Sequence, residues 1–195
     1  MVLQGSVGNQ VVARMVQRAK TDADRAGHQR RITMGRTAVG QLAGLVKRQL
    51  KDHIFNGTPM TGNVDKQRPQ GLHAYTNGRL PRGIVATETV GNENKVHVLK
   101  WRYASQQTNP KASTMFPRWM GTDEVSALIA LEYPDTMTQQ LDVGALPVNT
   151  GPNVAGGETR PITRSDIETH ILRGARVNLA KSGDTVYPTH PAFAG

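Results

Sequence analysis

The sequence predicts an α+β domain with antiparallel sheets, preceded by a basic helical segment. Helical spacing of apolar residues dominates the first 50 or so positions, and alternation typical of paired strands follows later, without the regular βαβ order of a parallel sheet. With 195 residues, 37% hydrophobic and 20% charged, the chain is large enough for one packed core.

Two amphipathic helices are expected at the N-terminal end, over residues 8–26 and 38–50. The second has apolar residues on one face and should run into His53; these are Val39, Leu42, Leu45, Val46 and Leu50. Because an isolated helical pair has little core of its own, at least the second helix should pack on the domain that follows. We therefore predict a basic helical segment at residues 1–47 and a main domain at residues 48–195.

The strand signals lie in the main domain. Residues 83–103 alternate on both sides of a GNEN turn and predict a β-hairpin. Thr122 is a reasonable N-cap for a buried helix, and residues 144–161 form a Gly/Pro-rich loop. Ser165 or Asp166 should open a short turn, after which two β-rich pieces around SGD predict a last hairpin within residues 170–188.

The net charge of +9 is concentrated near the N-terminus. Residues 1–51 hold ten Lys or Arg against two Asp, a net charge of +8, and the remainder carries +1. Such a segment suits phosphate groups or an acidic protein partner, and a solvated helix surface is the alternative.

Several function classes lack support. The chain has no cysteine, which excludes disulfides, thiolate metal sites and a cysteine nucleophile. It has no glycine-rich phosphate loop, HExxH helix, GxSxG elbow or EF-hand pattern. No run of about 18 apolar residues predicts a membrane span, and the N-terminus lacks the pattern of a secretory signal. Export, if it occurs, must be arranged by other means.

Two of the six histidines, His53 and His73, fall in the turn-rich stretch 52–78, where functional groups are common. His97 lies inside a predicted strand, and His170 and His190 flank the last hairpin, so structural roles are expected for these three. A histidine pair can accept and donate protons near neutrality, as attack of an RNA 2′-hydroxyl on its own phosphate requires. The pair could equally ligate a metal, although no carboxylate lies in a convincing ligand pattern beside it.

Four segments occur in a fixed order along the chain: HIFNG, GLHAYTNG, KASTMFPRWMGTDEVSALI and DTVYP. In this order they resemble the paired histidine motifs, the lysine and hydroxyl segment with its following helix, and the terminal strand of the EndoU-type endoribonucleases, whose bacterial members are often toxin domains. The matches cover about residues 48–190. The resemblance implies an EndoU/RNase A-like domain of two antiparallel sheets with packed helices.

The resemblance also implies roles for individual residues. His53 and His73 would be the acid and base pair, with His73 the preferred base. Lys111 or Thr185 would take the third catalytic position. Tyr187 would stack on the ribose or base, or serve as an ordinary strand tyrosine.

Further binding roles are open at two hydroxyl residues. Ser113 and Thr114 would contact a uracil edge, or serve in a turn or cap. Phe116 and Trp119 are expected in the core.

The expected function is therefore cofactor-free, metal-independent RNA cleavage leaving 2′,3′-cyclic phosphate ends. The bacterial branch of the family implies an interbacterial toxin, delivered from a producing bacterium into a target-cell cytoplasm and neutralised by a cognate immunity protein. The alternative is a non-catalytic RNA-binding or assembly module in which the basic segment does the binding.

Overall fold

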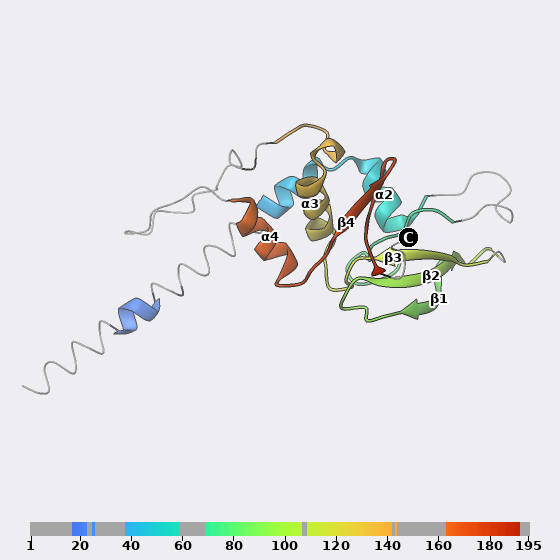
Figure 1. Ribbon diagram of the computed structural model, residues 1–195, viewed down its shortest axis with the longest axis horizontal. Helices are drawn as coiled ribbons and strands as arrows, with labels where there is room; N and C mark the ends of the chain where they lie inside the picture. Colours follow the sequence, from blue (N-terminus) through green and yellow to red (C-terminus); the bar gives the residue numbers. More distant parts are fainter. Residues whose placement is uncertain are drawn as a thin grey trace, which may run out of the picture.

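The predicted α+β class is confirmed by the computed structural model, which describes residues 17–22, 25, 38–58, 69–106, 109–141, 143 and 163–191. Helices α3 and α4 gather at one end, the sheet of β1 to β3 lies at the other, and α2 and the hairpin β4–β5 lie between them (Figure 1). The elements are α2 (Arg48–Asn56), β1 (Ile84–Val90), β2 (His97–Tyr103), β3 (Lys111–Met115), α3 (Thr122–Glu132), η2 (Pro134–Thr136), α4 (Arg164–Leu172), β4 (Leu179–Ser182) and β5 (Thr185–Pro188).

The larger sheet has the order β1-β2-β3 with antiparallel neighbours. Its first two strands confirm the hairpin predicted at residues 83–103, with a register shift between Ala86 and Glu88. Strand β3 was not predicted, because its sequence KASTM carries little apolar alternation. The hairpin predicted around SGD is confirmed as β4–β5, which occupies the second half of the predicted range 170–188. Strand β5 lies beside both α2 and β3.

The helix predicted over residues 38–50 is two helices. Residues 38–45 are helical, the chain breaks at Val46 and Lys47, and α2 then carries His53. The break has a tertiary cause: the Lys47 N–H donates to the Thr136 carbonyl at 3.0 Å, and the Thr138 N–H donates to the Leu45 carbonyl at 2.8 Å. These bonds replace the helical bonds that local propensity would have formed.

Two helix starts differ from the prediction. Thr122 is the first residue of α3, and Gly121 is its N-cap, with the Gly121 N–H donating to the Glu124 carboxylate at 2.6 Å. At α4 the N-cap is Thr163, which forms a capping box with Asp166.

The prediction of only a short turn at residues 165–166 followed by β structure from residue 170 was therefore wrong. The helix α4 continues to Leu172 because Ile167 and Ile171, one turn apart, are buried in the core.

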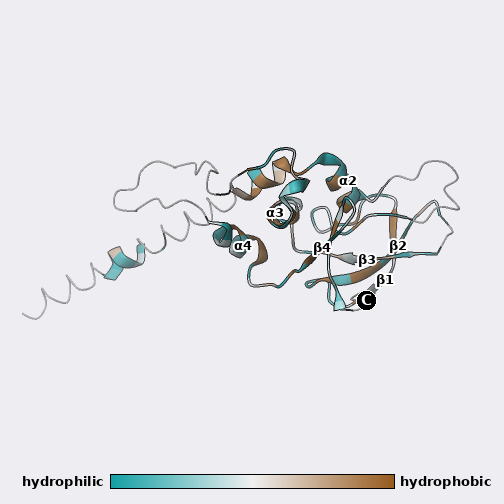
Figure 2. Ribbon diagram, turned by 45° about the horizontal axis from the view of Figure 1, so that its top comes forward, coloured by the Kyte–Doolittle hydropathy of each residue, from teal (hydrophilic) through white to brown (hydrophobic). Residues whose placement is uncertain are grey.

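The buried residues form two apolar clusters. The larger joins residues 38–46, α2, α3, α4 and Val186, so the helix at 38–45 packs on the domain that follows, as predicted. The smaller joins Leu72 and Tyr75 to the buried side chains Leu99, Trp101 and Met115 of the sheet. Hydrophobic residues accordingly colour the inner elements α3 and β2 in Figure 2. The segment 72–75 belongs to both clusters, since Ala74 packs in the larger one.

Parts of two predicted regions lie outside the described residues. These are most of the helix at 8–26, of which residues 17–22 and 25 are described and helical, and the Gly/Pro-rich loop at 144–161. Within the described part of the chain, no helix is both long and apolar enough to cross a membrane.

Candidate active site

The two predicted site histidines are brought together by backbone hydrogen bonds between α2 and residues 72–74. The carbonyls in the last turn of a helix have no partner within the helix. Here the His53 carbonyl accepts from the Leu72 N–H at 2.8 Å, and the Ile54 carbonyl accepts from the N–H groups of His73 at 2.7 Å and Ala74 at 3.2 Å. The imidazole centroids of His53 and His73 lie 6.4 Å apart.

This approach requires glycine at position 71. Gly71 has φ +70°, a conformation that L side chains rarely adopt, and an added Cβ would lie 2.2 Å from the His53 carbonyl oxygen. The glycine is buried beside α2. Its absence of a side chain therefore allows the two histidine segments to touch.

Strands β3 and β5 complete the cluster. The Thr185 hydroxyl lies 3.1 Å from His53 Nε2, and the Tyr187 ring stacks on the His73 ring with centroids 5.5 Å apart. Lys111, at the start of β3, carries the charge that acts electrostatically on both histidines. Five predicted residues from three distant parts of the sequence thus meet at one place: His53, His73, Lys111, Thr185 and Tyr187.

The hydrogen bonding of His73 fixes which ring nitrogen carries a proton. Nδ1 lies 2.9 Å from the backbone carbonyl of Thr114, and a carbonyl can only accept, so Nδ1 is the donor. Burial lowers the pKa of His73 to about 4, with smaller lowering by Lys111 and His53 opposed by the Thr114 bond. The neutral ring therefore keeps an unprotonated Nε2.

His53 has different partners. Its Nδ1 lies 2.5 Å from the hydroxyl of Thr58, and its Nε2 faces the hydroxyl of Thr185. A hydroxyl can donate or accept, so both the neutral and the charged ring are served. Partial burial and then the charge of Lys111 lower the pKa of His53.

Lys111 and Ser113 point to the same backbone carbonyl. The Lys111 ammonium lies 3.4 Å from the Gly71 oxygen, and the Ser113 hydroxyl donates to this oxygen at 3.2 Å. Burial lowers the pKa of Lys111. Ser113 also accepts from the Trp101 indole at 3.0 Å and is buried, so in this structure it connects the sheet to residue 71.

Thr114 is buried and contributes its backbone carbonyl to His73. Phe116 is buried in the larger cluster, as expected of a core residue. Trp119 is partly buried against that cluster, and its indole donates to the Asn94 carbonyl at 3.0 Å.

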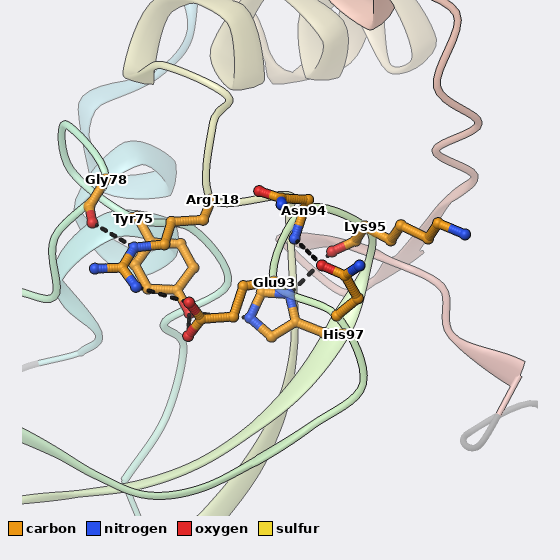
Figure 3. Close-up of polar contacts among 8 residues, drawn as sticks. Tyr75, Gly78, Glu93, Asn94, Lys95, His97 and Arg118 are labelled. Carbon is orange, nitrogen blue, oxygen red and sulfur yellow. Dashed lines mark hydrogen bonds and ion pairs between the residues drawn. The ribbon is translucent and has the colours of Figure 1, made fainter.

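A separate group of polar residues surrounds His97 at the turn between β1 and β2 (Figure 3). The buried His97 holds the Lys95 carbonyl through Nδ1 at 3.0 Å, and its Nε2 lies 2.9 Å from the Tyr75 hydroxyl. Arg118 lies over the Tyr75 ring and forms an ion pair with Glu93 at 2.7 Å. We call these residues the Tyr75–His97 network.

Thr58 was not predicted as a site residue, and it lies beside His53 in the structure. It follows Gly57, the C-cap of α2, which has φ +71°. A glycine just after a helix is a recognisable end signal, but the position of the next hydroxyl is not readable from it.

No group of three or more His, Asp or Glu positioned to hold a metal ion occurs among the residues that the structure describes. No family model, curated protein or solved structure matches the chain.

Proposed function

We propose that the chain is a metal-independent endoribonuclease of the EndoU type. It would cleave RNA by attack of a 2′-hydroxyl on the adjacent phosphate, leaving a 2′,3′-cyclic phosphate and a 5′-hydroxyl. One observation carries the proposal: two histidines with unlike hydrogen-bond partners lie together, and Lys111 acts electrostatically on both.

His73 is suited to be the base. Because Nδ1–H is committed to the Thr114 carbonyl, the free lone pair is on Nε2. In the first part of the reaction, Nε2 accepts the proton of the 2′-hydroxyl as the bond between O2′ and phosphorus forms. A base within a preformed hydrogen-bond frame needs little reorganisation when substrate binds.

His53 is suited to be the acid. Both of its ring nitrogens face hydroxyl oxygens, which can accept from an imidazolium. As the bond between phosphorus and O5′ breaks, the Nε2 proton goes to O5′. In the free protein the pKa of His53 is lowered, and a bound phosphate anion would raise it again because an opposite charge favours the protonated ring.

The remaining residues would handle the phosphate and the sugar. The partly buried Lys111 ammonium would stabilise charge on the non-bridging oxygens, where removal of such a donor costs roughly 10²–10³-fold in rate. In the free protein with His53 protonated, the Thr185 hydroxyl accepts from Nε2. With RNA bound, the leaving O5′ would take over this Nε2–H, and the Thr185 hydroxyl would donate its own proton to a phosphate oxygen. One face of Tyr187 packs on His73, which leaves the opposite ring face to stack on a ribose or base.

The finer fold assignment belongs to the same proposal. The observed sheets of three and two strands with packed helices are compatible with an EndoU/RNase A-like domain at residues 48–195. In an interbacterial toxin of this branch, residues 1–47 would be a basic segment ahead of the catalytic domain. A cognate immunity protein would protect the producing cell, and the target would be RNA in the recipient's cytoplasm.

RNA cleavage in the presence of EDTA is the direct test. Purified protein should cut a labelled oligoribonucleotide and leave cyclic phosphate ends. A matched oligonucleotide with a single 2′-deoxy sugar at the cut site should resist, because it lacks the nucleophile. Salt-sensitive RNA retention without cleavage would instead support the non-catalytic binding module.

Expression in a bacterial host tests the toxin role. The wild-type gene should inhibit growth, and the His73→Ala gene should be tolerated at the same protein level. Equal growth with the two genes, in cells where cleavage of RNA is detectable in extracts, would contradict the toxin role while leaving the nuclease activity intact.

A further inference from the structure

His53 has a hydrogen-bond partner at each ring nitrogen, and the closer partner is Thr58. The Nδ1 to Thr58 hydroxyl distance is 2.5 Å, against 3.1 Å from Nε2 to Thr185. Thr58 lies five positions beyond His53, outside the helix that carries the imidazole. The partner in the closer bond therefore lies just beyond the C-terminal end of α2.

The backbone of Thr58 is held on both sides. The Thr58 N–H donates to the Gln70 carbonyl at 2.9 Å, and the Thr58 carbonyl accepts from the Tyr103 hydroxyl at 2.9 Å. The chain reaches this position through Gly57, where an added Cβ would lie 2.8 Å from the Tyr103 hydroxyl and 3.2 Å from the Trp101 ring. Because the backbone is fixed in this way, Thr58 is held beside His53, and its hydroxyl can rotate to accept from the ring or donate to it.

The consequence concerns the location of a proton. If Nδ1–H donates to Thr58, the proton that leaves or joins the ring does so at Nε2, on the side of Thr185 and the other cluster residues. If instead Thr58 donates to Nδ1, the neutral ring keeps its proton on Nε2 and the imidazolium loses its Nδ1 proton first. Only the first arrangement makes Nε2 the transferable position of a general acid.

We propose that Thr58 is the positioning residue of His53, holding Nδ1–H so that proton transfer takes place at Nε2. This inference rests on the proposed ribonuclease function and deepens it. Thr58 accepts one hydrogen bond from the ring and does not touch the reacting atoms. A comparable outer partner orients the imidazole of metal-ligating histidines, where its loss typically costs about 10–100-fold in metal affinity or activity.

The charges around His53 favour the arrangement in which Nδ1–H donates to Thr58. Lys111 lowers the pKa of both histidines, so the charged ring forms against the field of another cation. An acceptor at Nδ1 offsets part of that cost by bonding to the imidazolium. The carbonyl at His73 Nδ1 serves the corresponding role for the other ring.

The decisive measurement is the tautomer of His53 in the full chain, read from side-chain ¹⁵N chemical shifts across a pH titration. The neutral wild-type ring should be protonated at Nδ1. A neutral ring protonated at Nε2 would overturn the proposal, and this measurement needs no variant.

Thr58→Val and Thr58→Ser form a matched pair, because valine keeps the shape and serine keeps the hydroxyl. In Thr58→Val, the His53 titration should move to lower pH, and the alkaline limb of the kcat/KM profile should move with it. The value of kcat at pH 7 should fall by about tenfold with KM little changed. Thr58→Ser should restore both readouts.

The outcomes separate the two ideas. A Thr58→Val protein with wild-type His53 shifts and titration would overturn the positioning role, even if RNA is cleaved. A wild-type protein that shows the expected tautomer and the expected response to Thr58→Val, but cleaves no RNA, would remove the nuclease function and keep the positioning role. Matching thermal unfolding of wild type and variants ensures that folded proteins are compared.

Discussion

The candidate site and the Tyr75–His97 network both combine histidine, tyrosine and a cation, and they differ in how their charges are balanced. In the Tyr75–His97 network, Glu93 pairs with Arg118. Burial lowers the pKa of His97; the bond to the Lys95 carbonyl and then the charge of Glu93 raise it, and His190 and Arg118 lower it by smaller amounts. At the candidate site, the described charged groups that shift the pKa values of His53 and His73 are cationic. A balanced network stabilises a turn, whereas converging cations without a carboxylate suit an anionic ligand.

The polar partners differ in the same way. Both ring nitrogens of His97 have protein partners, and the ring is fully buried. Among the described residues none is hydrogen-bonded to Nε2 of His73, and His53 is bonded to hydroxyls that can either donate or accept. A buried histidine is therefore better judged by the partners of its nitrogens than by its burial.

The largest expected effect is on RNA cleavage after replacement of a site histidine. His53→Ala and His73→Ala should each lower kcat by about 10²–10⁴-fold, the usual contribution of acid or base catalysis. His97→Asn is the matched control, since it removes an imidazole from the balanced network; its cleavage per folded molecule should stay near wild type. Single-turnover assays with circular dichroism measure both. Full activity in either site variant would remove that histidine from the pair.

The next effect is on stability and tests the close backbone approach of Gly71 to His53, which belongs to the candidate site and not to the Tyr75–His97 network. Gly71→Ala places a Cβ 2.2 Å from the His53 carbonyl at φ +70°. We expect a loss on the order of 3 kcal/mol or more in unfolding free energy, from αL strain and the broken contact. Gly83→Ala is the control: φ is +85°, nothing lies within 4 Å, and about 1 kcal/mol is expected. Equal losses in urea unfolding would contradict the close approach.

Lys111→Met should reduce cleavage by about 10²-fold, because it removes the cation that acts on both histidines. The same change should raise the pKa values of His53 and His73, since Lys111 lowers them. Lys100→Met is the control, as Lys100 pairs with Glu88 on the exposed hairpin. A cleavage rate in Lys111→Met equal to that of the control would leave Thr185 as the third catalytic residue.

The pH profile should be bell-shaped and acidic. His73 must be neutral to act as the base, so kcat/KM should rise as pH increases through about 4, the pKa of His73. His53 must be protonated to act as the acid. Burial and then the charge of Lys111 lower its pKa from the ordinary value, so kcat/KM should fall above this lowered pKa, about tenfold per pH unit. An optimum of kcat/KM above pH 7 would contradict this assignment of acid and base.

The smallest effect is expected in the balanced network. Tyr75→Phe removes the hydroxyl that lies 2.9 Å from the buried His97 Nε2 and 3.4 Å from a Glu93 carboxylate oxygen, and should cost about 1–2 kcal/mol in unfolding free energy. Thr87→Val, which removes an exposed side-chain bond to the Lys100 carbonyl, should change stability by no more than about 0.5 kcal/mol. Cleavage by folded Tyr75→Phe should be unchanged, and a large loss would mean that the two clusters are coupled.

Helix and strand patterns in the sequence predicted the elements whose own residues stabilise them. The hairpin of β1 and β2, the buried helix α3 and the end of the last hairpin followed from periodicity and turn residues. The break at Val46 and the helix at 164–172 did not, because bonds to residues 136–138 cause the first and burial of Ile167 and Ile171 against distant elements supports the second.

The candidate site draws on residues that are already recognisable in the sequence: two histidines in turn-rich sequence, a lysine and a late Thr-Val-Tyr strand. The hydrogen-bond partners of the histidine ring nitrogens, in contrast, follow from the folded chain. The Thr114 carbonyl at His73 and the Thr58 hydroxyl at His53 come from backbone held by long-range hydrogen bonds. Residue identity and spacing carry no information on such bonds, because the partners meet only when the chain folds back upon itself.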